Sequence, residues 1–204
     1  MSESNANSRL EAFCDGVFAI ALTLLIIDIK IPSMESIGSS TELWRALRHL
    51  GPEIFALALS FIIILITWVN HHGMLKLVRK SSPLFIYANG FLLLTVVFIP
   101  FPTSLLGAFI RTDHATPAVV LYNAVLACQA IGWILMSGSA LKNRLVQEDH
   151  AVAQIRKLYQ NGCFACGFYS LLALAAVWFP ISSALITTAS WIFWLVLGIR
   201  MKHV

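Results

Sequence analysis

Residues 9–32 read RLEAFCDGVFAIALTLLIIDIKIP, an apolar middle flanked on both sides by charged residues. The uninterrupted apolar part holds only about a dozen residues, whereas a membrane-crossing helix needs about 20. By length alone, the segment is ambiguous between a buried helix and a membrane span. The charged flanks and the composition of the remaining chain therefore decide between the two.

The composition of the whole chain favours a membrane protein. Of its 204 residues, 58% are apolar and 12% are charged, and the mean hydropathy is +0.80. Soluble domains usually carry about 25% charged residues, so this excess of apolar side chains requires lipid around it. The net charge of +4 is spread singly or in small groups between apolar runs. We therefore interpret the basic residues as topology signals and expect no binding of nucleic acid.

Six segments are apolar and long enough to cross a bilayer as helices. They lie near Leu10–Ile31, Pro52–His72, Pro83–Leu106, Ala118–Leu141, Gly162–Phe179 and Ser183–Ile199. None shows the period-two alternation of a membrane barrel strand. Pro100 and Pro102 should end or kink the third segment. The sequence thus predicts an all-α, polytopic membrane protein in which residues 1–204 form a single six-span domain.

The basic residues also predict the orientation of these spans. With the N-terminus inside, ten of the fourteen Lys and Arg residues fall on the inner side and four on the outer side. Because positive charge is enriched in cytoplasmic loops, both termini are expected in the cytoplasm.

Acidic residues at the ends of the first span admit two interpretations. Asp15 lies within or at the inner edge of the membrane, where a carboxylate needs a partner or water. It either caps the helix, favoured by the helix dipole, or belongs to a polar network that holds this helix beside an ion path. Asp28, near the other end, would then stand at the mouth of that path.

One face of the first span is apolar. It carries residues spaced three and four apart, which are Ile20, Thr23, Leu24, Ile27 and Ile31. In an average membrane helix such a stripe faces lipid or the protein core. Several copies of this helix around an axis would instead form an apolar neck between acidic mouths, and such a neck can gate by dewetting.

The motif that opens this span resembles a known family. Arg9, followed by Phe13, Cys14, Asp15 and Gly16, is similar to the RxxxFSD signature of the transmembrane-protein-175 type of potassium channels. The similarity continues through residues 17–25, and the six-span layout covers essentially the whole chain. The departure is Cys14, where the family usually has serine, because a thiol is a poorer hydrogen-bond donor than a hydroxyl.

The resemblance implies a homotetrameric potassium-permeable channel in which the first helix of each subunit lines the pore. By register with the motif, Ile20, Leu24 and Ile27 correspond to the apolar constriction, and Thr23 corresponds to the threonine associated with a preference for potassium. An isoleucine ring cannot replace an ion's hydration shell, so selectivity at the constriction should be weak to moderate. A single six-span repeat is typical of bacterial members and implies the cell (inner) membrane.

A second, weaker match lies at the end of the second span. Trp68, Asn70 and His71 are either ordinary interfacial residues or brace Arg9 and Asp15 through hydrogen bonds, and the resemblance favours the bracing role. A histidine there would also make the protein sensitive to pH.

Other functions have less support in the sequence. No Ser-His-Asp set, metal-ligand cluster or phosphate loop lies within the spans, so we expect no catalytic residues, no metal and no cofactor. The permeant partners are expected to be K⁺ and other monovalent cations or protons, in a lipid bilayer. A proton-conducting channel or proton-coupled transporter, with Asp15 or a histidine as the relay, remains an alternative, and so does a non-conducting membrane assembly factor.

Overall fold

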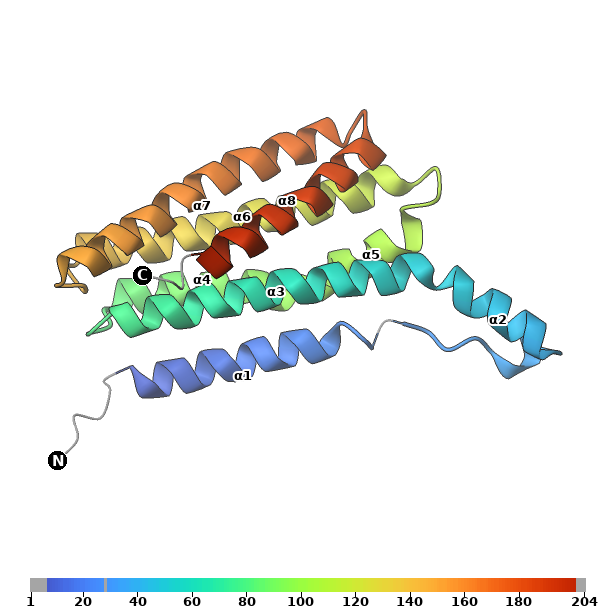
Figure 1. Ribbon diagram of the computed structural model, residues 1–204, viewed down its shortest axis with the longest axis horizontal. Coiled ribbons are helices and arrows are strands. Elements are labelled where there is room, and N and C mark those ends of the chain that lie inside the picture. Colours follow the sequence, from blue (N-terminus) through green and yellow to red (C-terminus); the bar gives the residue numbers. More distant parts are fainter. Residues whose placement is uncertain (1–6, 28, 201–204) are drawn as a thin grey trace.

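The computed structural model describes residues 7–27 and 29–200, and over this range the chain is helical with no strand. Its helices are shown in Figure 1. In chain order they are α1 (Ser8–Leu24), the 3₁₀ turn η1 (Met34–Ser36), α2 (Ser40–His49), α3 (Gly51–Leu77), α4 (Pro83–Phe98), α5 (Pro100–Phe109), α6 (Ala115–Lys142), α7 (Asp149–Ala175) and α8 (Pro180–Arg200).

Each apolar segment predicted from the sequence contains helix, but α1 ends at Leu24, seven residues before the predicted end of the first segment at Ile31. Three stretches are long and apolar enough to cross a bilayer, namely Gly51–Leu77, Pro83–Phe109 and Ala115–Lys142. The protein is therefore a multi-pass membrane protein. The count of six spans stays a prediction, because α1 has only 17 residues and α7 carries charged residues along its first half.

The third segment is interrupted where its prolines predicted. α4 ends at Phe98 and α5 begins at Pro100. Pro100 and Pro102 have no N–H to donate to the preceding turn. The residue between the two helices, Ile99, keeps right-handed helical angles (φ −53°, ψ −40°), so the segment continues in the same direction after the break.

Two features differ from the sequence prediction. α2 was not predicted, because it is short and only one side of it is apolar. Its start is fixed by Ser39, whose hydroxyl accepts from the Glu42 N–H at 3.2 Å, while the Glu42 carboxylate accepts from the Gly38 N–H at 2.6 Å. α7 begins at Asp149 rather than Gly162, because the helix continues past the apolar part into a charged end.

The bundle places α1 at its edge. α6 contacts α4, α5, α7 and α8, whereas α1 packs along α3 and α4 (Figure 1). The main core contains Phe18 from α1, Ile64 from α3 and Val96 from α4, each at most 1% exposed. The fold thus leaves one side of α1 facing away from the rest of the chain.

Gly107 is required by the close approach of α5 to α3. A Cβ atom added there would lie 2.8 Å from the Cα of Glu53. We expect Gly107→Ala to lower the free energy of unfolding by about 1–3 kcal/mol, as overpacking does. Gly90, in α4, is a matched control, because nothing lies within 4 Å of its added Cβ and alanine there should stabilise the helix by up to about 1 kcal/mol. Thermal unfolding in detergent checks both, and equal midpoints for the two variants would contradict the close packing.

Candidate functional site

The two faces of α1 have opposite environments. Cys14, Phe18 and Ala21 are at most 1% exposed and pack into the subunit. Phe13, Ile20 and Ile27, spaced by seven residues, are 62%, 58% and 69% exposed. Seven residues make two helical turns, so Phe13 and Ile20 lie on one side of α1, and Ile27 is in the turn that follows the helix. α1 therefore presents an apolar face that the rest of the described chain does not cover.

The residues predicted to line a pore lie on this exposed face. Leu24 is 36% exposed and is the last residue of α1. Ile27 lies in the turn that follows, and its backbone N–H donates to the Leu24 carbonyl at 3.2 Å. The Thr23 hydroxyl donates to the Ile20 carbonyl at 2.9 Å, which leaves the hydroxyl oxygen free to accept from outside the helix. Asp28, predicted as a pore-mouth acid, lies outside the described residues.

Asp15, in the first half of α1, is tied to α3. Its carboxylate accepts a 2.8 Å hydrogen bond from the indole N–H of Trp68. The Trp68 ring stacks on His72 at 5.7 Å between centroids. His72 Nδ1 lies 2.9 Å from a Glu11 oxygen, within ion-pair distance but outside hydrogen-bond geometry. This group joins the acidic side of α1 to an aromatic pair on α3.

A second set of polar contacts is fully buried and joins three helices. His71 Nε2 bonds the side-chain oxygen of Asn89 at 2.6 Å, and the Asn89 amide nitrogen donates to the sulfur of Cys14 at 3.2 Å. All three residues are at most 1% exposed. Because the Asn89 oxygen is the acceptor, the proton in the first bond belongs to His71. Cys14 thus serves as an acceptor, a role that does not depend on its weakness as a donor.

Not every predicted motif residue joins these contacts. Arg9 is exposed and forms no side-chain polar contact within residues 7–27 and 29–200, and Phe13 is on the exposed face. Asn70 lines a separate cavity between α3 and the later helices. The sequence reasoning missed Asn89, although a lone amide in the apolar run 83–98 was a usable signal.

Titratable side chains do not gather into a metal site here. Over residues 7–27 and 29–200, no group of three or more His, Cys, Asp or Glu side chains is placed to hold a metal ion. The described polar contacts instead position α1 on α3 and α4. The arrangement offers an exposed apolar surface on α1 and, in the first half of the helix, an acid that is bonded to α3.

The Cys14 contact leads to a prediction about stability. Cys14→Ala should lower the free energy of unfolding by about 1–3 kcal/mol, because the buried Asn89 N–H loses its acceptor. Cys14→Ser should retain or exceed the wild-type value, because a hydroxyl oxygen accepts better than sulfur. Thermal unfolding of the purified protein measures both variants. Equal losses for serine and alanine would show that the sulfur acts by packing alone.

Comparison with known proteins identifies relatives along most of the chain. The family model described as endosomal/lysosomal potassium channel TMEM175 matches residues 9–100. A protein of Chamaesiphon minutus named as a potassium channel is 37% identical over 88% of this chain and 93% of its own length. One of Chryseobacterium, also named as a potassium channel, is 30% identical over 81% of this chain and 90% of its own.

A more distant relative and a solved structure indicate the same family. The chicken protein named endosomal/lysosomal proton channel TMEM175 is 34% identical over 56% of this chain, which spans 24% of that protein. The crystal structure of the Chamaesiphon minutus lysosomal potassium-selective channel TMEM175 homolog covers 94% of this chain and 97% of its own, with 31% identity and a TM-score of 0.79. These matches are to ion channels and not to enzymes. The chain belongs to the TMEM175 channel family.

Proposed function

We propose that the protein is a cation channel whose pore is lined by α1 from each subunit of a homotetramer. The observation that carries this proposal is the apolar face of α1, which its own subunit leaves uncovered while the opposite face is packed into the core. An apolar helix face without a partner is expected to find one in an assembly or in lipid. Relatives named as channels favour the assembly.

The constriction in this proposal is a ring of Ile20, with further rings of Leu24 and Ile27. Their exposed fractions of 58%, 36% and 69% leave each side chain free to meet its symmetry mates. Such rings resist wetting when narrow and conduct when they widen. Phe13 and Asp15 would lie at the inner entrance and Asp28 at the outer one.

Potassium is the permeant ion that we propose first, because the bacterial relatives are named as potassium channels. Thr23 lies between the Ile20 and Ile27 rings and keeps an oxygen free to accept toward the axis. One hydroxyl ring gives few oxygen ligands, so selectivity for K⁺ over Na⁺ should be weak to moderate.

Protons are the second candidate, because the vertebrate relatives are named as proton channels. Asp15 is an acid near the proposed entrance, and its carboxylate accepts from the Trp68 indole at 2.8 Å. In this version Asp15 would take up protons before they reach the apolar neck.

The distribution of positive charge supports a proposal about the location and orientation of the protein. We propose the cell (inner) membrane, with both termini in the cytoplasm. The end of α3, the start of α4, the end of α6 and the start of α7 lie on one side of the bundle with the start of α1 (Figure 1). Lys76 is in the last turn of α3, Lys142 is in the last turn of α6, and Lys80 lies just before α4. That side then carries most of the positive charge.

The experiment is ion flux from liposomes containing the purified protein. Imposed gradients of potassium, sodium and protons are applied one at a time, and the reversal potential is measured in planar bilayers. The channel proposal expects potassium flux with a smaller sodium flux, and protein-free liposomes are the control. A reversal potential that follows the proton gradient alone would favour the second candidate, and the absence of any flux would contradict both.

A further inference from the structure

A groove with a volume of about 520 Å³ lies between α3, α5, α6 and α8. Its lining includes residues near the start of α3, the end of α5 and the start of α8, which meet at the end of the bundle next to α2 (Figure 1). α1 contributes none of the described lining residues. Ligand sites usually have volumes of about 300–1,000 Å³, so the groove is large enough to bind a molecule of its own.

The length of the groove matches one leaflet of a bilayer. Its α8 residues run from Ile181 to Trp191, which at 1.5 Å per residue is about 15 Å along the helix. The hydrocarbon core of a bilayer is about 30 Å thick, so one leaflet accounts for about the same length. An acyl chain of one leaflet therefore fits along the groove.

The walls of the groove are apolar and its rim is open. Phe55, Ile181 and Leu185 line it and are 57%, 50% and 65% exposed. Ala56 and Val119, which also line it, are 3% and 1% exposed and form its floor. Apolar side chains therefore surround an opening on the outside of the chain, where lipid tails can enter.

Three polar side chains of the lining are bonded within the chain. The Thr187 hydroxyl donates to the Asn123 side-chain oxygen at 2.7 Å, and the Thr188 hydroxyl donates to the Ala184 carbonyl at 2.9 Å. The Asn123 amide nitrogen donates to the Val119 carbonyl at 2.9 Å. Because both hydroxyl protons are already bonded, an acyl chain can lie against these walls without orphaning them.

Arg111 lies at the end of the groove with its charge unpaired. It is exposed, follows α5 in the turn that leads to α6, and is the only charged residue among the described lining. Within residues 7–27 and 29–200 its guanidinium forms no hydrogen bond or ion pair, not even with Asp113 in the same turn. A guanidinium stays charged and can bind two phosphate oxygens at once. The groove thus combines an apolar slot with a phosphate-binding group.

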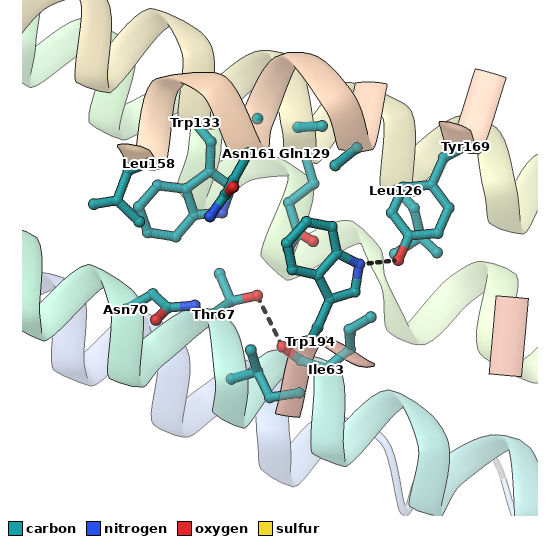
Figure 2. A pocket seen from close by; sticks show the side chains of 14 residues that line it. Ile63, Thr67, Asn70, Leu126, Gln129, Trp133, Leu158, Asn161, Tyr169 and Trp194 are labelled. Atoms are coloured by element: carbon teal, nitrogen blue, oxygen red, sulfur yellow. Dashed lines mark hydrogen bonds between the residues drawn. The ribbon is translucent and has the colours of Figure 1, made fainter. Parts of the chain in front are cut away.

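The cavity in Figure 2 lacks both of these properties. It has a volume of about 90 Å³ between α3, α6, α7 and α8, and none of its described lining residues is charged. The indole of Trp194 reaches into it and donates to the Tyr169 hydroxyl at 3.0 Å (Figure 2). A cavity of roughly 150 Å³ accommodates one benzene, so this cavity is too small for an acyl chain.

We propose that the groove binds a phospholipid of net negative charge, with one acyl chain along α8 and the phosphate at Arg111. A zwitterionic headgroup fits less well, because its own cation competes with the guanidinium for the phosphate. The other candidate occupant is a second copy of the chain, and the test separates the two. The site is apart from α1, so the inference does not depend on which ion the protein conducts.

The test is native mass spectrometry of the full-length protein in detergent, which counts the lipids bound per chain. Phosphatidylglycerol is titrated, and phosphatidylcholine with the same acyl chains is the zwitterionic control. We expect saturable binding of one phosphatidylglycerol per chain. Phosphatidylcholine should bind about fivefold more weakly, which corresponds to about 1 kcal/mol for one basic side chain at an anionic headgroup. Equal binding of the two lipids would overturn the proposal.

Arg111→Gln tests the headgroup contact and should weaken the binding of phosphatidylglycerol about fivefold. Arg48→Gln is the matched control, because Arg48 is exposed in the last turn of α2, at the same end of the bundle, but does not line the groove. It removes the same charge and should leave the binding unchanged. An equal loss in the two variants, or no loss in Arg111→Gln, would contradict the site.

Ala184→Phe tests the acyl slot. Ala184 is half-buried and lines the groove, whereas Ala189 on the same helix is exposed and lies outside it. Ala184→Phe should abolish the saturable binding and Ala189→Phe should retain it, with thermal unfolding as the check that both variants fold. If Ala184→Phe does not fold, the exposed Arg111→Gln decides the question. Lipid binding that persists in a folded Ala184→Phe overturns the proposal, and loss of the oligomer with unchanged lipid binding would identify a second copy as the occupant.

Discussion

Ile20→Asn is expected to raise single-channel conductance by about tenfold, which corresponds to lowering the barrier by about 1.4 kcal/mol. An amide in each subunit would hold water in the neck, where isoleucine excludes it. Because Ile20 is 58% exposed within its own subunit, the change removes little packing from the subunit core. Selectivity for K⁺ over Na⁺ should fall, since both ions would pass with more of their water.

The control for this variant is Ile20→Leu, which keeps the ring apolar and should change the conductance by less than about twofold. Both variants are measured in planar bilayers with symmetrical potassium solutions, followed by a sodium gradient. An Ile20→Asn channel with wild-type conductance would mean that the narrowest part of the pore lies elsewhere.

Asn89→Leu is expected to cause the largest loss of stability among single polar substitutions in the described chain. Leucine has the same branching at Cγ but no polar atom, so it breaks both bonds of Asn89, to His71 at 2.6 Å and to Cys14 at 3.2 Å. An orphaned buried partner costs about 1–3 kcal/mol, most of it here from His71. Because these bonds connect α1 to α3 and α4, potassium flux per protein should fall as well.

Thr95→Val on the same helix is the matched control. Thr95 is also buried, but its hydroxyl donates only to the nearby Leu92 carbonyl at 2.6 Å. Valine at this position therefore leaves no distant side chain without a hydrogen-bond partner. Thermal unfolding in detergent should show a midpoint several degrees lower for Asn89→Leu and close to wild type for Thr95→Val. Equal midpoints would mean that the bonds of Asn89 contribute no more to stability than the local bond between Thr95 and Leu92.

The positions of the helices were predictable from the sequence because hydropathy and proline act locally. The break beside Pro100 follows from a missing N–H in the same segment. α2 was not predictable in the same way, because its apolar residues Leu43, Trp44 and Leu47 remain 42%, 67% and 41% exposed and it resembles a polar loop in composition.

The candidate site was predictable only where a local signature carried it. The motif around Asp15 indicates a polar network that includes Trp68, and the bond between these two side chains agrees with it. Asn89 could not be assigned, because its partners stand 18 and 75 residues away in sequence and are brought together only by the packing of α1, α3 and α4. The choice between a lipid-facing and a pore-facing stripe on α1 also depends on neighbours that one subunit does not contain.

The most direct measurement of the central claim, that the exposed face of α1 lines the pore, is block by Ag⁺, a monovalent ion that binds thiolates. Cys128, Cys163 and Cys166 are first replaced by serine, and cysteine is then introduced at Thr23 on the exposed face or at Ala21 on the buried one. The pore-lining arrangement predicts that Ag⁺ abolishes potassium current in Thr23→Cys and spares both Ala21→Cys and the serine background. Block of Ala21→Cys with no effect on Thr23→Cys would contradict it.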